Sequence, residues 1–492
     1  MTSSAALSRS SRRLDGDLAD PGALADRAVT VLGLGSFGGG VAVTRYLVSR
    51  GARVTVTDQK GEADLGPSVQ ALRGLPVKLV LGRHEPADLL EADLVVKNPA
   101  IPWSSPWVQQ VRAAGVPITS ELVLGLERLW APYAMVTGSK GKSTTSTLLG
   151  AMAGGGGAPV AVAGNNERPL LDALARLDGP DARAVLEVSS FMADDVAAAR
   201  ARGVALRPPE VVVFTLLEPE HLNWHGTVEA YYEAKLSLLD LGPKLCVIPA
   251  DDRELAARVP GRLQPGTRLV RVAATRGPGA EVDVGVSGER ALDRDGQLLF
   301  DLRALRLLGA HNRENALLAA AAARALGADP AAIAAGAAAV EPLPHRLEPV
   351  ATSPGRGVRF VNDSCATTPS AAMAALEAVP GPVVLLLGGS DKGHAWGELA
   401  RAAAARAHAV VCLGQTGPAI ADAVEAAVAS GAGGARVLRT NLGFDGAFAA
   451  ALAACPTGGA VLLAPATASY DMFPNFKARG ERFRQLAREA AR

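Results

Sequence analysis

Short apolar runs alternate with alanine- and leucine-rich stretches along nearly the whole chain. The clearest runs are AVTVLGLG, ARVTVTD, LVVKNP, YAMVTG, AVLEVSS, EVVVFTLL, KLCVIPA, VVLLLGG, AVVCLG and AVLLAPA. Continuous apolar runs of this length are typical of strands buried on both faces of a parallel sheet. The alternation predicts an α/β fold throughout, and 492 residues correspond to about three domains at roughly 150 residues each.

Two segments offer boundaries between domains. LWAPYA at 129–134 precedes a strand-like run, and VEPLPHRLEPV at 340–350 is rich in proline. We predict a disordered tail at 1–27 and domains at 28–132, 133–343 and 344–492. In the glycine-rich stretch 253–305, apolar and polar residues alternate, which predicts small antiparallel strands. The alanine-rich stretch 317–340 predicts paired helices.

Charge and cysteine content narrow the class of protein. Lys and Arg (50) nearly balance Asp and Glu (49), so the bulk charge favours neither nucleic acid nor an anionic membrane as a partner. The four cysteines have no C-x-x-C spacing, which suits a reducing compartment and excludes a cysteine zinc site. No apolar run is long enough to cross a membrane and the N-terminus lacks a secretion signal, so a cytoplasmic protein is expected.

The first glycine-rich loop has the spacing of a dinucleotide fingerprint. Gly33, Gly35 and Gly38 follow one strand-like run, and the next such run ends at Asp58. This pattern predicts a helix N-terminus that accepts a phosphate, with an acidic residue for a ribose. Three interpretations stay open: NAD, a different ribonucleotide, or a tight turn with no ligand.

A second glycine-rich loop, VTGSKGKSTT at 136–145, resembles a shortened phosphate-binding loop. Gly138 lies only three residues ahead of Gly141, whereas the usual pattern is G-x-x-x-x-G-K-[ST]. The glycines allow backbone N–H groups to face an anion, Lys142 supplies a positive charge, and the hydroxyl of Ser143 or Thr144 can bind Mg²⁺. The alternative is a fortuitous cluster of Gly, Lys and Ser.

Three further residues could belong to the same site. Glu187 follows a strand-like run, where its carboxylate could complete a magnesium site or merely neighbour a helix N-cap. His221 and His225 have the spacing of a zinc-binding pair, but no H-E-x-x-H glutamate lies between them. Lys235 lies in a helical, partly apolar run and could equally be a surface lysine.

Taken in order, these motifs and several others resemble those of the Mur ligases, the ATP-dependent amide-forming enzymes of peptidoglycan synthesis. The matching segments are TGSKGKSTT, GNN, LEVSSF, PEHLNWHG with AKL, GAHNRENALLAAA, LPHRLE, NDSCATTPSA, LLGGSDKG and APATASYDMFPNFKARGERF. The similarity runs from Gly33 to about Phe483. It implies a Rossmann-like N-terminal domain, a P-loop ATPase-like central domain and a Rossmann-like C-terminal domain that closes over the site. The shortened loop is then a family trait.

The resemblance assigns ATP and two Mg²⁺ ions to the central domain. The positions that match nucleotide-binding residues are Gly138, Ser139, Lys140, Gly141, Lys142, Ser143, Thr144, Asn312, Asn315, Arg346 and Asp363. One ion is expected at Ser143 or Thr144 and Glu187, and the second at His221 and a carbamylated Lys235. Carbamylation converts an ammonium group into an anionic oxygen ligand. The catalytic residues implied are Lys142, Glu187, His221, Lys235 and Lys392.

The resemblance also implies the two substrates, UDP-N-acetylmuramoyl-L-alanine and glutamate. The positions that match substrate-binding residues are Gly35, Ser36, Asp58, Asn165, Thr367, Lys392, Ser469 and Phe476. The γ-phosphoryl group of ATP would activate the substrate carboxylate as an acyl phosphate, which the amine of glutamate attacks. Phosphoryl transfer of this kind needs mainly positioning and charge neutralisation. A monomer is expected.

The third-domain motif departs from the family pattern at the place where glutamate is selected. Cys365 replaces a lysine and Thr368 an asparagine, and a variant branch that adds L-glutamate shares the T-T-P ending. The SDKG and ASYDMFPNFKARGERF segments favour D-glutamate. An NAD-dependent oxidoreductase and a non-catalytic nucleotide-binding regulator are the alternatives from other classes.

Overall fold

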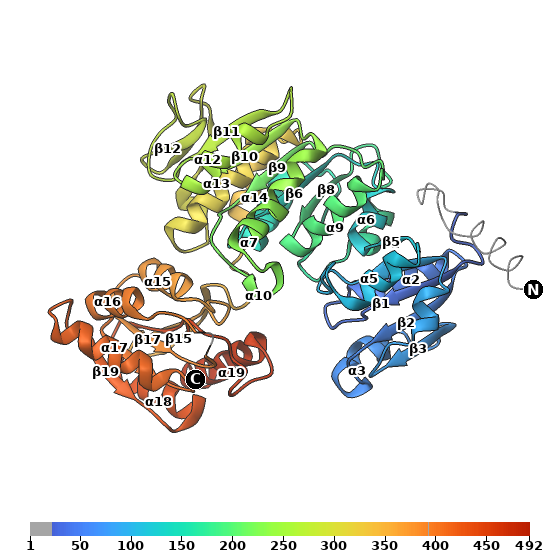
Figure 1. Cartoon of the computed structure of the whole chain (residues 1–492). Helices are drawn as coiled ribbons and strands as arrows, with labels where there is room; N and C mark the ends of the chain where they lie inside the picture. The colour runs from blue at the N-terminus through green and yellow to red at the C-terminus, as the bar shows by residue number, and fades with distance from the viewer. Residues whose placement is uncertain (1–21, 392) are drawn as a thin grey trace, which may run out of the picture. The chain divides into compact units, whose positions relative to one another are not determined.

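The computed structural model describes residues 22–391 and 393–492 and confirms the predicted α/β fold. Its strands form three separate sheets, drawn in blue, in cyan to yellow and in orange to red (Figure 1). The predicted tail at 1–27 lies mostly outside the described residues. The described part of the chain divides into two compact units, one comprising 22–304 and 314–339, the other 305–313, 340–391 and 393–492.

The N-terminal sheet has five parallel strands in the order β3-β2-β1-β4-β5. Its strands are β1 (Ala28–Leu32), β2 (Arg53–Asp58), β3 (Val77–Leu81), β4 (Leu94–Lys97) and β5 (Ile118–Thr119). The helices of this part are α2 (Gly39–Ser49), α3 (Glu62–Ala71), α4 (Pro86–Leu90), α5 (Pro106–Ala113) and α6 (Glu121–Leu126). The strand order reverses between β1 and β4, which is where open α/β sheets bind ligands.

The central sheet has nine strands in the order β14-β13-β12-β11-β10-β9-β6-β8-β7. Its strands are β6 (Tyr133–Thr137), β7 (Val160–Gly164), β8 (Arg183–Glu187), β9 (Val211–Phe214), β10 (Leu245–Pro249), β11 (Arg268–Val272), β12 (Val284–Ser287), β13 (Arg290–Asp293) and β14 (Leu298–Asp301). Strand β6 is buried along its whole length, as the apolar run predicts. The antiparallel prediction for 253–305 is confirmed for β12 to β14 but wrong for β11, which continues the parallel part of the sheet.

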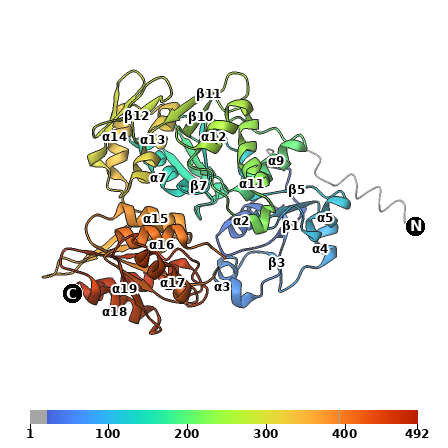
Figure 2. The same ribbon diagram turned by 60° about the vertical axis from the view of Figure 1, so that its left-hand side comes forward.

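Helices surround the central sheet, and α14 packs against α7 (Figure 2). The helices are α7 (Lys142–Gly154), α8 (Leu170–Ala173), α9 (Ser190–Ala201), α10 (Leu222–His225), α11 (Val228–Leu236), α12 (Arg253–Arg258), α13 (Ala310–Ala325) and α14 (Pro330–Ala339). Short 3-10 turns occupy Leu174–Arg176, Ser237–Leu241, Pro260–Arg262 and Leu302–Ala304. The predicted pair of helices in the alanine-rich stretch is confirmed as α13 and α14.

The C-terminal sheet has six strands in the order β15-β16-β20-β17-β18-β19. Its strands are β15 (Glu348–Thr352), β16 (Arg359–Asn362), β17 (Val383–Leu387), β18 (Ala409–Cys412), β19 (Arg436–Arg439) and β20 (Ala460–Leu463), and only β15 is antiparallel. The helices are α15 (Pro369–Ala378), α16 (Gly397–Arg406), α17 (Gly417–Ala429), α18 (Gly443–Ala454) and α19 (Phe476–Ala490).

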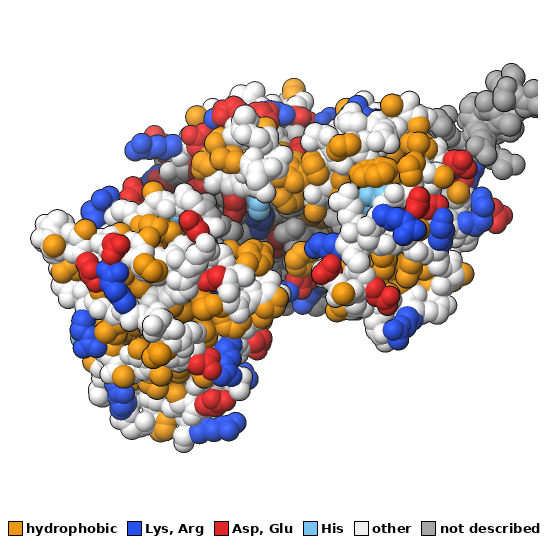
Figure 3. Space-filling model, turned by 60° about the horizontal axis from the view of Figure 1, so that its bottom comes forward, with side chains coloured by type: hydrophobic (Ala, Val, Ile, Leu, Met, Phe, Trp, Pro, Cys, Tyr) orange, Lys and Arg blue, Asp and Glu red, His pale blue; other side chains and the backbone are white. Residues whose placement is uncertain are grey.

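The surface is chemically mixed. On the face shown in Figure 3, Lys and Arg side chains are interspersed with Asp and Glu, and neither sign forms a continuous field. Within the described part of the chain, no helix combines the length and apolar character needed to cross a bilayer.

Candidate active site

The second glycine-rich loop connects β6 to α7, the context that a phosphate-binding loop requires. Gly138 and Gly141 have positive φ angles of 139° and 85°. A Cβ on Gly138 would lie 2.1 Å from Thr215 Oγ1, and one on Gly141 would lie 2.6 Å from Asn315 Oδ1. Only glycine therefore fits at either position, since a side chain would be strained and would collide. Gly141 is the N-cap of α7, so the N-terminus of that helix faces the loop.

Two lysines meet at one carbonyl oxygen of this loop. Lys142 Nζ and Lys235 Nζ each donate a hydrogen bond of 2.8 Å to Gly138 O. Lys235 is almost completely buried on α11, and its ammonium lies 4.8 Å from the centroid of the Tyr231 ring. Burial and the neighbouring charge of Lys142 hold the pKa of Lys235 well below its usual value. The structure thus places the predicted Lys235 beside the loop and excludes the surface-lysine interpretation.

Glu187 ends β8, next to the strand that leads into the loop. Val136 of β6 pairs with Glu187, so the carboxylate lies at the same sheet edge as Gly138. Its side chain is 1% exposed, and Asn165 Nδ2 donates to Glu187 Oε1 at 3.0 Å. Glu187 Oε2 is buried and has no hydrogen-bond partner among the described residues. A buried carboxylate oxygen of this kind is costly unless a cation or donor satisfies it.

The two histidines lie in different environments. His221 is the N-cap of α10, has φ 55° and is exposed, whereas the His225 side chain is 2% exposed and its Nε2 hydrogen-bonds with Ser190 Oγ at 2.9 Å. Partial desolvation is the main cause that lowers the pKa of both, and neighbouring positive charges add to it, although Glu220 opposes the shift at His221; the pKa of His225 falls to about 4. Nε2 of the buried His225 is engaged by Ser190, whereas the more exposed His221 offers a neutral imidazole as a ligand. The zinc interpretation is not supported.

The remaining polar groups of the loop form a tight network. Lys140 forms an ion pair with Glu220, and the charge of Lys140 helps to hold the pKa of Glu220 below its usual value despite burial. Ser139 Oγ donates to Glu218 O at 2.7 Å and accepts from Tyr231 OH at 3.0 Å. Ser143 and Thr144 begin α7 with their hydroxyl groups on its first turn.

Asn312 and Asn315, which match nucleotide-binding positions of the family, are both buried on α13. Asn315 Oδ1 accepts from Thr145 Oγ1 of α7 at 3.1 Å, which ties α13 to the helix that follows the loop. Asn312 Nδ2 donates to Leu308 O at 2.7 Å.

Asp58, the last residue of β2, accepts hydrogen bonds from a backbone N–H of the first glycine-rich loop and from one in the turn that follows β2. Asp58 Oδ2 accepts from Gly35 N at 3.0 Å, and Oδ1 accepts from Lys60 N at 2.9 Å. Ser36 is exposed in the same loop, and Asn165 is exposed after β7. The sequence did not reveal Asn98, which follows β4 and donates to Gly33 O at 3.3 Å.

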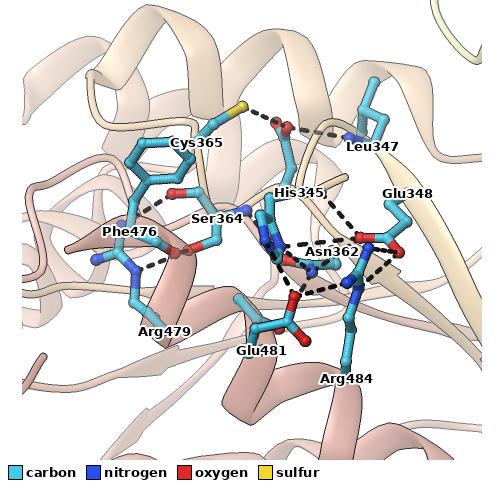
Figure 4. A network of polar contacts seen from close by, with 12 residues as sticks. His345, Leu347, Glu348, Asn362, Ser364, Cys365, Phe476, Arg479, Glu481 and Arg484 are labelled. Carbon is cyan, nitrogen blue, oxygen red and sulfur yellow. Dashed lines mark hydrogen bonds and ion pairs between the residues drawn. The ribbon is translucent and has the colours of Figure 1, made fainter. Parts of the chain in front are cut away.

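The C-terminal unit brings several predicted residues into one polar network (Figure 4). Asp363 accepts from Leu347 N at 3.1 Å and from Cys365 Sγ at 3.4 Å, and burial raises the pKa of Asp363 to about 6. The side chain of Ser364 donates to Phe476 O at 2.7 Å, which fixes the start of α19. His345 N donates to Glu348 Oε2 at 2.9 Å, so the residues on either side of Arg346 are both anchored.

Arg479, which the sequence did not reveal as a site residue, lies at the centre of this network. It is 1% exposed and donates to Ser364 Oγ, Ser364 O, Thr467 O and Ala468 O. Ser469 directly follows Ala468 in the chain and is 2% exposed, and Thr367 is half-buried. The prediction for Lys392 falls outside the described residues.

Among the described residues, no group of three or more His, Cys, Asp and Glu side chains forms a ready-made metal site. Any metal here would therefore need oxygen ligands of other kinds, such as the Ser143 or Thr144 hydroxyl, a phosphate oxygen or a carbamate.

Comparison with known proteins covers nearly the whole chain. Family models match residues 27–120 (Mur ligase MurD-like, N-terminal domain), 136–323 (Mur ligase middle domain) and 345–467 (Mur ligase, glutamate ligase domain). The chain is 35% identical over 469 residues to the UDP-N-acetylmuramoylalanine–D-glutamate ligase of Symbiobacterium thermophilum, covering 94% of this chain and 98% of the relative. It is 37% identical to the enzyme of the same name from Gloeobacter violaceus, covering 93% and 98%.

Solved structures share the fold. The chain matches the UDP-N-acetylmuramate–alanine ligase MurC of Thermotoga maritima with a TM-score of 0.61 at 18% identity, covering 94% of this chain and 99% of the other. It matches the MurF ligase of Thermotoga maritima, solved in complex with ADP, with a TM-score of 0.53 at 17% identity, covering 97% and 99%.

Proposed function

Because this chain belongs to the Mur ligase family, we propose that it is an ATP-dependent ligase that joins D-glutamate to UDP-N-acetylmuramoyl-L-alanine in peptidoglycan synthesis. The names of its relatives support the substrates, and the MurD-like model over residues 27–120 supports a uridine nucleotide rather than NAD at the first glycine-rich loop. The observation that carries the chemistry is the meeting of Lys142 and Lys235 at Gly138 O, one strand away from the unpaired carboxylate oxygen of Glu187.

The loop residues position ATP and neutralise its charge. Backbone N–H groups at the start of α7 and the Lys142 ammonium would bind the phosphates, and Lys140, which pairs with Glu220, adds a second cation to this loop. A carboxylate is a poor acylating agent, so transfer of the γ-phosphoryl group to the carboxylate of the L-alanyl end creates a group that an amine can displace. Positioning and charge neutralisation are what this step demands of the protein.

The residues present fit magnesium. Glu187 offers a buried, unpaired carboxylate oxygen, Ser143 and Thr144 offer hydroxyl groups, and His221 offers a neutral imidazole because its pKa is lowered. Bound Mg²⁺ would supply charge neutralisation at the phosphates and at the tetrahedral oxyanion that forms during amine attack. Lys235 suits carbamylation, since burial lowers the pKa of its amine and so favours the unprotonated form that can add CO₂.

In the C-terminal unit we propose that Lys392, Thr367, Ser469 and Phe476 bind glutamate and that Arg346 and Asp363 act toward ATP. The support is the match of these positions to the family motifs. Arg479 places a buried positive charge among Ser364, Thr467 and Ala468, next in sequence to Ser469. These four hydrogen bonds fix the segments that carry Ser364 and Ser469.

The second candidate is a ligase for L-glutamate, because Cys365 stands where a lysine is usual and its Sγ is turned to Asp363 Oδ1. The test for both is phosphate release from ATP with UDP-N-acetylmuramoyl-L-alanine and either D- or L-glutamate. Release with neither enantiomer would overturn the proposed function.

A further inference from the structure

The short loop after β4, residues 98–101, contacts the first glycine-rich loop. Asn98 Nδ2 donates to Gly33 O, and Asn98 N donates to Leu32 O at 2.9 Å. The space that Gly33 and Gly35 leave without side chains is filled by Asn98, because a Cβ on Gly33 would lie 2.9 Å from Asn98 Cβ and one on Gly35 would lie 2.8 Å from Asn98 Nδ2. Any ligand-dependent change in the glycine-rich loop therefore acts directly on this short loop.

The same loop is held firmly from its other side. Lys97 Nζ donates to Ile101 O at 2.8 Å and forms a fully buried ion pair of 2.8 Å with Asp195 of α9. Breaking one partner of a buried ion pair is strongly destabilising, so the loop keeps its place relative to α9. The loop is thus a stiff connection between the N-terminal sheet and the central sheet.

Trp224 joins this loop to the turn that carries His221. Its indole Nε1 donates to Ala100 O at 3.1 Å. The indole ring lies 4.6 Å from the Phe191 ring, which in turn meets the His221 ring edge-on at 5.0 Å. Trp224 N also donates to His221 O at 3.0 Å, so one residue contacts both the loop and the turn.

We propose that Trp224 is a positioning residue that couples the uridine-nucleotide loop to the His221 turn. A ligand in the glycine-rich loop fixes the positions of Asn98 and Ala100. The hydrogen bond from the Trp224 indole to Ala100 O then fixes the position of α10, and with it the position of His221 in the central site. The uridine nucleotide as the ligand of the glycine-rich loop and the role assigned to His221 both rest on the proposed function, whereas the contacts of Trp224 do not. Coupling of this kind is a free energy between two sites and acts in both directions.

The test uses the full chain and UDP alone as the probe. Hydrogen exchange is followed in peptides covering 98–103 and 221–226, with and without UDP, in the wild type and in Trp224→Phe. The phenylalanine keeps a ring against Phe191 and removes the N–H donor. Trp130→Phe is the matched control, because Trp130 is 75% exposed and lies away from this contact, over the guanidinium of Arg207.

We expect UDP to slow exchange in both peptides of the wild type and of Trp130→Phe, but only in 98–103 of Trp224→Phe. We also expect the KM for UDP-N-acetylmuramoyl-L-alanine to rise about fivefold in Trp224→Phe, the effect of losing one neutral hydrogen bond, while the KM for ATP is unchanged. Trp224→His, which keeps an N–H donor, is expected to recover part of the loss. If UDP protects 221–226 equally in Trp224→Phe, or slows exchange in 98–103 but not in 221–226 of the wild type, the coupling is wrong. If UDP slows exchange in neither peptide of the wild type, the uridine-nucleotide assignment of the glycine-rich loop is wrong, and the proposal falls with it. If the exchange pattern holds but the wild type forms no amide, the proposed function fails and the coupling stands.

Discussion

Replacing Glu187 by Gln tests the magnesium assignment, because the change removes one charge and almost no volume. The glutamine oxygen can still accept from Asn165 Nδ2, which now binds Glu187 Oε1 at 3.0 Å. What is lost is the negative charge on Oε2, the buried oxygen without a partner in the described residues. If Oε2 only stabilises the fold, its replacement changes the melting temperature. If Oε2 binds a cation, its replacement changes kcat.

The expected effects of Glu187→Gln on stability and on kcat can be worked out separately. An unpaired buried amide nitrogen costs ~1–3 kcal/mol, and an unpaired buried carboxylate oxygen costs at least as much, so the substitution adds no net penalty to the folded protein. The melting temperature is therefore expected to stay within ~4 °C of the wild type. Loss of a charge that stabilises the transition state lowers kcat by about 100- to 1,000-fold.

The assay is phosphate release as a function of Mg²⁺ concentration at saturating substrates. We expect Glu187→Gln to raise the Mg²⁺ concentration for half-maximal rate and to lower the maximal rate. Glu121→Gln is the matched control, since Glu121 is also buried but binds Leu171 N at 2.8 Å in another part of the fold. Wild-type kinetics in Glu187→Gln, or a large fall in its melting temperature, would refute the reasoning.

Three further predictions address other parts of the account. Lys235→Ala is expected to lower kcat ~100-fold or more, the scale of one lost transition-state contact, and added acetate should restore part of it; a variant that acetate leaves unchanged counts against the carbamate. Gly141→Ala imposes a strained backbone at φ 85° and a contact with Asn315, so the KM for ATP should rise about tenfold for a strain of ~1–2 kcal/mol; an unchanged KM speaks against this loop as the phosphate site. Burial raises the pKa of Glu121 from 4.5 to about 7, so between these pH values the folded state holds a proton that the unfolded state releases. The free energy of unfolding therefore falls as pH rises from 4.5 to 7, by at most about 3 kcal/mol. Glu121→Gln should flatten this pH dependence in chemical denaturation, and an unaltered pH dependence contradicts the burial argument.

The fold was largely predictable because its signals are local. A continuous apolar run specifies a buried strand wherever it occurs, and β6, β8 and β20 appear where the sequence indicates. Strand β11 shows the limit of such reasoning. Its alternating residues indicate an antiparallel strand, yet it pairs in parallel with β10 because the sheet continues beside it.

The turn from β6 into α7 was predictable for the same reason, since its glycines, lysine and hydroxyl groups lie within ten residues; its role in phosphate binding stays a prediction. The supporting contacts were not, because they join distant parts of the chain. Arg479 and Ser364 are 115 residues apart, and Trp224 and Ala100 are 124 apart. Each of these residues is unremarkable in its own segment, and only the folded arrangement gives it a partner.

The central claim is that this chain forms an amide between UDP-N-acetylmuramoyl-L-alanine and D-glutamate at the expense of ATP. The most direct measurement is phosphate release by the full chain, with the product identified by mass, in parallel reactions that contain D-glutamate, L-glutamate or neither. The account predicts release and product with D-glutamate, and neither with L-glutamate or without an amino acid. Product with L-glutamate alone would contradict the assigned substrate, and no product with either enantiomer would contradict the assigned reaction.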